Sequence, residues 1–320
     1  MKSSLLRIFK ALAAITLAVL LLYALWSPGS SDQPPASHGK NGAWLTHAWW
    51  GDDYWFKFSS RKPEDYQGLE AVTKMAEKMQ KMGISDWYVH ACPADKNGNL
   101  PNLSIEQGKL MVQANNAGQV LAWVGGVQED CLLTEPKWRS NFCQDTAKLV
   151  SEAGLAGIQL NIEPCPSFEP GYLGLLDELR IALPEGSRIS VAAYPPPSML
   201  HPFPEVHWNQ EFYDEISKRC DDIVVMAYDA SQPISKTYIW MVKSWTEESL
   251  AWSKVPVRIG LPAYGDDGVG YHDPKIENIS NALSGLSAGI SESAQNYHGW
   301  AVYAEWTLDE SEESILSSLP

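Results

Sequence analysis

Short apolar segments alternate with segments of helical periodicity along the chain from Ala43 onward. Several apolar segments are continuous runs of Val, Ile and Ala, which is typical of strands buried on both faces. The predicted strands are Ala43–Ala48, Asp86–His90, Val120–Val124, Gly157–Ile162, Ile189–Ala193, Ile223–Ala227, Arg258–Leu261 and Gly299–Tyr303. The predicted helices are Leu69–Met82, Ile105–Asn116, Trp138–Ala153, Tyr172–Ala182, Gln210–Lys218, Tyr238–Trp252, Ile276–Ala288 and Glu310–Ser318.

This alternation predicts an α/β fold, a single (β/α)8 TIM barrel over residues 43–320. Right-handed crossovers leave few topologies for such a chain, and eight units close into a barrel. A doubly wound open sheet would carry a glycine-rich phosphate loop after its first strand. Here the first strand leads into His47, Trp49, Trp50 and Asp52, which is no such loop.

Residues 1–26 differ from the rest of the chain. Lys2, Arg7 and Lys10 precede an uncharged apolar run that ends at Trp26. No clean small-residue cleavage site follows, so we expect a signal anchor rather than a cleaved signal peptide. The positive residues would stay cytoplasmic, which places the barrel on the periplasmic or extracellular side of the membrane; secretion is the alternative. Residues 27–42 are rich in Ser, Pro and Gly and predict a flexible linker.

Charge and composition exclude some partners. The chain has 24 Lys and Arg against 39 Asp and Glu, a formal charge of −15. This balance argues against nucleic-acid binding and against electrostatic docking of the globular surface on anionic lipid. The 14 Trp and 13 Tyr outnumber the 7 Phe, as expected where aromatic faces meet a partly polar ligand. No protein partner can be inferred.

The five cysteines show no CxxC spacing, and the histidines show no paired ligand spacing. We therefore expect no metal and no cofactor. Export would permit disulfides, and Cys131 and Cys143 lie close together across one predicted loop. A Cys131–Cys143 bond is predicted, with five small buried thiols as the alternative.

Active sites of such barrels lie at the carboxyl ends of the strands. Carboxylates, amides and aromatic rings, the groups that bind sugars, are abundant there. Those residues are His47, Trp49, Asp52, His90, Asp95, Gln128, Glu129, Asp130, Gln159, Asn161, Glu163, Tyr194, Met226, Tyr228, Asp229, Tyr264, Asp266, Asp267, Tyr303, Glu305 and Trp306. Strand alternation puts Gln159, Asn161 and Glu163 on one side of the fourth strand. They form either a site or a buried polar network that only fixes packing.

Three motifs resemble those of the chitinase-like family 18 glycoside hydrolases. The family's DGxDxDxE is matched by AGIQLNIE at residues 156–163, its MxYD by residues 226–229, and its GLPxYG by residues 260–265. Trp306 matches the tryptophan that ends the family's eighth strand. The resemblance spans about residues 43–308 and implies a TIM barrel that hydrolyses glycans with N-acetylated sugars.

The resemblance also implies roles for residues. Glu163 would be the general acid, and the substrate's own acetamido group the nucleophile, outside the usual two-carboxylate scheme. Asn161 and Tyr228 would hold the acetamide, Asp229 would position Tyr228 or a hydroxyl, and Trp306 would stack beneath the sugar. Further substrate contacts are expected from Trp49, Gln159, Met226, Tyr264 and Glu305.

The chain departs from the family at three aspartates of the fourth strand, which are Ala156, Gln159 and Asn161 here. The Asn-x-Glu triplet resembles that of endo-β-N-acetylglucosaminidases, which keep activity with an amide at this position. Two alternatives stay open. One is a two-carboxylate glycosidase with Glu305 or Asp266 beside Glu163, and the other is a non-catalytic carbohydrate-binding barrel.

Overall fold

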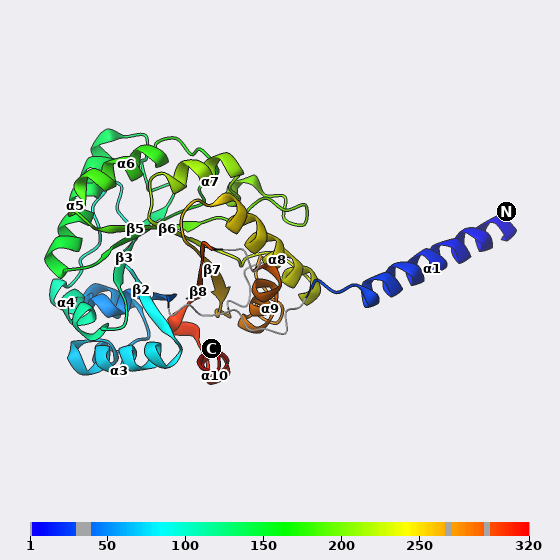
Figure 1. Ribbon diagram of the computed structural model, residues 1–320, viewed down its shortest axis with the longest axis horizontal. Coiled ribbons are helices and arrows are strands. Elements are labelled where there is room, and N and C mark those ends of the chain that lie inside the picture. Colours follow the sequence, from blue (N-terminus) through cyan, green and yellow to red (C-terminus); the bar gives the residue numbers. More distant parts are fainter. Residues whose placement is uncertain (1, 30–39, 266–270, 291–294, 320) are drawn as a thin grey trace.

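Eight parallel strands close into one barrel in the computed structural model, which describes residues 2–29, 40–265, 271–290 and 295–319 (Figure 1). Each strand pairs with its sequence neighbours, and β1 pairs with β8. The predicted barrel is confirmed. The strands are β1 Asn41–Leu45, β2 Ile84–His90, β3 Val120–Val127, β4 Gly157–Glu163, β5 Arg188–Ala193, β6 Asp222–Val225, β7 Val257–Pro262 and β8 Tyr297–Tyr303.

Helices surround the barrel as predicted (Figure 1). They are α3 Gly68–Lys81, α4 Ile105–Ala114, α5 Pro136–Ala153, α6 Tyr172–Ala182, α7 Gln210–Ser217, α8 Ser235–Trp252, α9 Ile279–Gly289 and α10 Glu310–Ser317. Additional short elements have no counterpart among the predicted ones: the helix α2 Asp53–Phe58 and the 3-10 turns η1 His47–Trp50, η2 Pro63–Asp65, η3 Pro204–Val206 and η4 Glu305–Thr307.

Capping residues explain where the predicted boundaries shift. The Thr46 side chain accepts a hydrogen bond from the Ala48 amide and starts η1, so β1 ends at Leu45. Asn278 caps α9 through its side chain, which accepts from the Asn281 amide, so this helix begins at Ile279. Both are side-chain oxygens that satisfy the free amides of a first helical turn.

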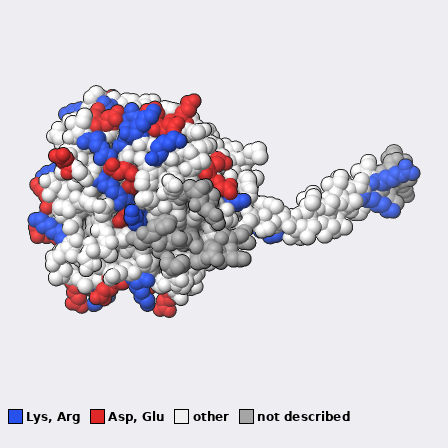
Figure 2. Space-filling model, viewed as in Figure 1, with Lys and Arg blue, Asp and Glu red and all other residues white. Residues whose placement is uncertain are grey.

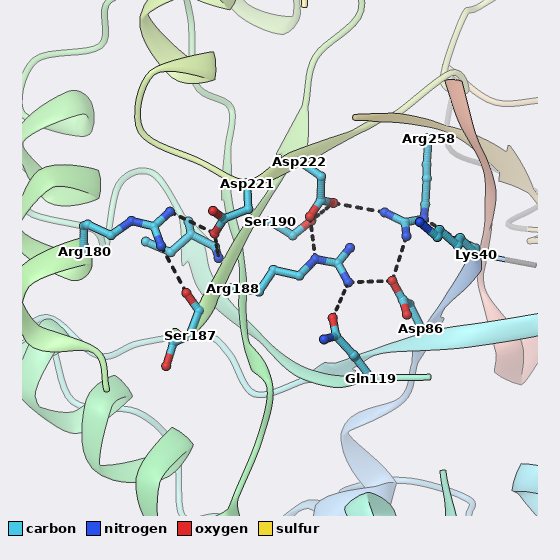
Figure 3. Close-up of polar contacts among 11 residues, drawn as sticks. Lys40, Asp86, Gln119, Arg180, Ser187, Arg188, Ser190, Asp221, Asp222 and Arg258 are labelled. Carbon is cyan, nitrogen blue, oxygen red and sulfur yellow. Dashed lines mark hydrogen bonds and ion pairs between the residues drawn. The ribbon is translucent and has the colours of Figure 1, made fainter. Parts of the chain in front are cut away.

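The amino-terminal end of the barrel is closed by a charge network (Figure 3). Arg188 on β5 donates to Asp86 at 2.6 Å and to Asp222 at 2.5 Å. Arg258 on β7 bonds the same two carboxylates at 2.8 and 3.1 Å. Two positive and two negative groups therefore compensate one another; Asp86, Asp222 and Arg258 are buried and Arg188 is partly buried.

The N-terminal helix α1, Lys2–Leu25, projects from the barrel beside α8 and α9 (Figure 1). Within the described residues, Arg7–Leu25 is the helix apolar and long enough to cross a membrane, and it is not buried against the barrel. Its surface is uncharged along most of its length, and cationic side chains gather at its outer end (Figure 2). An N-terminal apolar helix of this kind is consistent with a signal sequence or an anchor.

The predicted Cys131–Cys143 disulfide is wrong. All five cysteines are free thiols, and all are buried. Cys131 follows β3 and Cys143 faces inward from α5, where both pack as small side chains in the apolar layer between strands and helices. Burial raises the pKa of each of these two thiols to about 12. Proximity in sequence across a loop did not bring the two sulfurs together.

Candidate functional site

A cavity of about 650 Å³ opens at the carboxyl ends of β4, β5 and β6. Parallel barrels carry their sites at this end, because the loops that follow the strands converge there. The lining residues that end or follow these three strands include Glu163, Tyr194, Met226, Tyr228 and Asp229. Four of them were predicted as site residues from the sequence, and Tyr194 was noted there without a role.

Glu163 is the last residue of β4, and two side chains hold its carboxyl group. Asn161 Nδ2 donates to Oε1 at 2.7 Å, and the Tyr194 hydroxyl donates to Oε2 at 3.2 Å. The Glu163 side chain is exposed where it faces the cavity, while the barrel wall packs around it on its other sides. This desolvation raises the pKa of Glu163 above its ordinary value, although the two hydrogen bonds act in the opposite direction.

Asn161 is buried on the same side of β4, two residues before Glu163. Gly125 lies beside it on β3, and a side chain at that glycine would collide with the Asn161 carbonyl. The Asn161 side-chain oxygen Oδ1 has no hydrogen-bond partner in the described chain. An unsatisfied buried acceptor costs about 1–3 kcal/mol. Asn161 is not among the residues that line the cavity, so an N–H donor of a ligand would reach this oxygen only after side chains rearrange.

Tyr228 and Asp229 follow β6 at the edge of the cavity. The Tyr228 ring stacks on Tyr303 with centroids 5.3 Å apart and meets Tyr264 edge-on. Burial raises the pKa of Tyr228 well above its ordinary value, so its hydroxyl stays protonated and can donate. Asp229 has a positive φ of 57° and accepts a hydrogen bond from the Tyr264 hydroxyl. Tyr264 thus contacts Asp229 and does not line the cavity itself.

Asp229 also faces a buried imidazole. His272 Nε2 lies 2.9 Å from the Tyr264 carbonyl oxygen and must carry a hydrogen there. Its other nitrogen, Nδ1, lies 3.6 Å from Asp229 and 3.5 Å from Glu277. Within the described ranges these three side chains are the group that could hold a metal ion.

The remaining predicted residues lie elsewhere. Gln159 is fully buried deeper in the barrel, and neither of its polar side-chain atoms has a hydrogen-bond partner in the described chain. Trp306 in η4 is partly buried with its ring edge-on to Tyr303 at 5.7 Å, and it does not line the cavity. Gln159 and Trp306 therefore lie near the cavity but do not form its wall.

Trp49 and Glu305 line a different cavity, of about 400 Å³, beside α3. The Trp49 indole donates to Glu305 Oε2 at 3.4 Å, and burial raises the pKa of Glu305. The structure does not bring Glu305 together with Glu163, and Asp266 lies outside the described residues. Asp229 is the other carboxylate among the described residues that line the Glu163 cavity.

Several lining residues had no counterpart among the predictions: His201, Phe203, Val206, Ser231, Trp245 and Tyr271. They come from the loops after β5, β6 and β7 and from α8, which carry no strand periodicity. The sequence could have identified Tyr194 as a site residue, because Tyr194 directly follows β5 and so lies at the carboxyl end of the barrel.

Comparison with known proteins agrees with this geometry. A model of the glycosyl hydrolases family 18 matches residues 58–312, which is most of the barrel. The chain belongs to glycosyl hydrolases family 18. A search of curated proteins gave no match.

Solved structures share the fold of this family 18 chain at low identity. The Bacillus cereus spore cortex-lytic enzyme SleL superimposes with a TM-score of 0.60 at 12% identity, covering 88% of this chain and 74% of SleL. The Ostrinia furnacalis Group IV chitinase gives 0.56 at 15% identity, covering 84% and 93%. The Rhizomucor miehei chitinase gives 0.53 at 17% identity, covering 88% and 100%.

Proposed function

We propose that this family 18 chain is a glycosidase that cleaves glycans with N-acetylated sugars by substrate-assisted chemistry with retention of configuration. The observation that supports it most is the Asn161–Glu163 pair: Glu163 presents a carboxyl group with a raised pKa to the cavity, and Asn161 behind it bonds that group and keeps a buried amide oxygen without a partner in the described chain. Solved structures with this fold include chitinases and spore cortex-lytic enzymes, which fits such a substrate class.

In the first step Glu163 protonates the glycosidic oxygen as the bond to the anomeric carbon breaks. The carbonyl oxygen of the substrate's acetamido group attacks that carbon and forms a cyclic oxazolinium ion. Asn161 Oδ1 accepts the acetamide N–H, and the Tyr228 hydroxyl donates to the acetamide oxygen. In the second step the Glu163 carboxylate takes a proton from a water molecule, whose oxygen bonds the anomeric carbon from the face that the leaving group vacated. The bond from that carbon to the oxazolinium oxygen breaks, which restores the acetamide and retains the configuration.

Other site residues act by position. Tyr194 holds the second carboxyl oxygen of Glu163, and Asp229, bound by Tyr264, fixes the chain at the end of β6 or binds a sugar hydroxyl. Met226 lines the cavity and offers an apolar contact to the sugar. Gln159 and Trp306, near but not in the cavity wall, would reach the sugar only after side-chain rearrangement. No cofactor enters this scheme.

We further propose that α1 is an uncleaved anchor that holds the barrel on the periplasmic or extracellular side. Its apolar surface and the cationic residues Arg7 and Lys10 near its start support this orientation. Protease treatment of cells whose outer envelope has been opened and whose inner membrane is intact should digest a tag at the C-terminus and spare one at the N-terminus. Recovery of a chain that begins after residue 26 would instead indicate a secreted form.

The catalytic proposal is tested by a matched pair of variants. Glu163→Gln should abolish hydrolysis of a chitooligosaccharide and retain binding, because the amide keeps the shape but cannot deliver a proton. Glu305→Gln, in the separate cavity, should leave turnover within about twofold, since the amide keeps the shape of the side chain and can still accept the Trp49 hydrogen bond. Loss of turnover in both variants would favour the two-carboxylate alternative, in which Glu305 acts with Glu163. Activity kept in Glu163→Gln would remove Glu163 from the acid role. Glycan binding by the unaltered protein without any turnover would favour a binding barrel.

A further inference from the structure

Apolar side chains are exposed around the mouth of the catalytic cavity. The apolar rim consists of Met199, Leu200, Phe203, Ile234 and Tyr271, on the loops that follow β5, β6 and β7. Met199 is 92% exposed, and the others are between 41% and 51% exposed. Phe203 and Tyr271 also line the cavity, so the cavity opens within this rim. Exposed apolar groups gathered at one place mark a contact surface.

Hydrogen bonds join the three loops of the rim. The Gln232 side chain donates to the Leu200 carbonyl at 3.2 Å and to the Ala230 carbonyl at 2.8 Å. The Ser231 amide donates to the Tyr271 carbonyl at 3.1 Å. These bonds link the loop after β6 to its neighbours on both sides, so the rim residues belong to one continuous surface.

The carboxyl end of α1 meets the same surface. Lys236 Nζ donates to the carbonyls of Tyr23 at 3.1 Å and Trp26 at 2.9 Å, and it lies 5.0 Å from the centroid of the Tyr23 ring. A lysine at the free carbonyls of a helix end satisfies those groups and opposes the helix dipole. Lys236 lies two residues after Ile234 of the rim, in the first turn of α8.

This meeting point is not dictated by chain connectivity. Strand β1 begins at the opposite, amino-terminal end of the barrel, where Arg258 bonds the Lys40 carbonyl. Trp26 nevertheless lies at the start of α8, at the carboxyl ends of the strands. The helix end therefore lies at the catalytic end of the barrel although the chain enters the barrel at the other end.

We propose that the apolar rim docks on the lipid surface beside the α1 anchor, so that the catalytic cavity opens at the membrane. The proposal rests on the anchor in the proposed function. Tyr23 and Trp26 are the aromatic residues expected at the membrane–water boundary, and Lys236 reaches the same level. The rim contacts lipid through apolar side chains, so the net charge of −15 is no obstacle and zwitterionic lipid suffices. A glycan carried on a lipid would be the favoured substrate.

The test uses the full chain reconstituted in phosphatidylcholine vesicles. A single environment-sensitive dye is attached through Met199→Cys, or through Ile181→Cys as a control; the buried native thiols react slowly. Ile181 on α6 is 85% exposed and lies outside the rim. Brominated lipid should quench the dye at position 199 and spare it at 181. Equal and weak quenching at both positions in vesicle-bound protein would overturn docking. So would a dye at 199 that is shielded only at high protein density, which would assign the rim to a second copy.

A functional readout separates docking from catalysis. The double variant Met199→Asp/Ile234→Asp should hydrolyse a free chitooligosaccharide as the unaltered protein does, because neither residue lines the cavity. It should hydrolyse the same oligosaccharide attached to vesicle lipid more slowly by a factor of at least about ten, which is the scale for losing a single one of the two buried apolar side chains. Unchanged hydrolysis of the lipid-attached glycan would overturn the proposal. Failure of the unaltered protein on the free glycan would instead contradict the proposed function, and failure of the chain to float with vesicles would contradict the anchor.

Discussion

The side-chain amide of Asn161 donates a 2.7 Å hydrogen bond to Glu163, and its carbonyl oxygen is left without a partner in the described chain. One end of the amide therefore bonds the Glu163 carboxyl group, and the other end is a buried acceptor. An aspartate at this position would place a second charge beside Glu163. The amide avoids that repulsion and keeps an acceptor for the substrate.

Asn161 variants test the substrate-assisted step. Asn161→Ala should lower the rate by about 10²–10³-fold, the scale for losing one preorganised electrostatic contact. Asn161→Asp should keep or raise activity at neutral pH, because a carboxylate stabilises the oxazolinium ion through a charge-assisted bond. Both variants should be assayed on matched acetamido and hydroxyl substrates. Equal losses on the two substrates would mean that Asn161 only supports Glu163.

The pH profile reports on Glu163. A general acid must be protonated, so kcat/KM should fall as the pH rises through the pKa of Glu163, which burial has raised. Tyr194 bonds the carboxyl group and lowers this pKa. Tyr194→Phe should therefore move the alkaline limb to higher pH. Tyr213→Phe is the control, since the Tyr213 hydroxyl bonds the Tyr194 carbonyl and not Glu163. A limb that moves equally in both variants would contradict this role of Tyr194.

The charge network at the amino-terminal end of the barrel should stabilise the folded state (Figure 3). Burial alone would raise the pKa of Asp222, but Arg188 and Arg258 outweigh it and hold the pKa below its ordinary value. Such a carboxylate stabilises the fold above its unfolded-state pKa, about 3.9, and this contribution is lost as the pH falls through the folded-state pKa. Asp222→Asn should lower the free energy of unfolding by about 3–5 kcal/mol at neutral pH, as measured by urea unfolding. In this variant the free energy of unfolding should also fall less steeply as the pH is lowered.

Asp221→Asn is the matched control for Asp222. The neighbouring Asp221 pairs with Arg180 at 2.9 Å, and the two side chains are 46% and 42% exposed. Exposed ion pairs contribute about 1 kcal/mol or less. Equal losses of unfolding free energy in the two variants would show that the buried network contributes no more to stability than an exposed ion pair.

The reactivity of the thiols tests whether all five cysteines are free. Because all five thiols are buried and none is bonded, the native protein should react slowly with iodoacetamide at pH 8. Unfolding in urea without reductant should expose all five to alkylation, as counted by mass spectrometry. A Cys131–Cys143 cross-linked peptide in non-reduced protein would contradict this.

The sequence by itself determined the barrel, because its information is local and periodic. Buried parallel strands need continuous apolar runs, and the predicted β4 at Gly157–Ile162 falls within the observed Gly157–Glu163. Strand alternation also put Asn161 and Glu163 on one side, and the order of the strands put Tyr228 and Asp229 at the same end. These inferences need no knowledge of distant contacts.

Only the tertiary structure decided which strand ends meet. Trp49 and Glu305 follow β1 and β8, so their position after a strand predicted them for the site just as it predicted Glu163. In the structure η1 and η4 turn these two side chains toward α3, where they line another cavity. Tyr194 gained its role through a hydrogen bond that spans 31 residues of sequence. Cys131 and Cys143 stayed apart because each is held in the apolar layer by its own element. Such outcomes depend on how loops and turns pack, and the energies of those contacts are set by neighbours that no local pattern encodes.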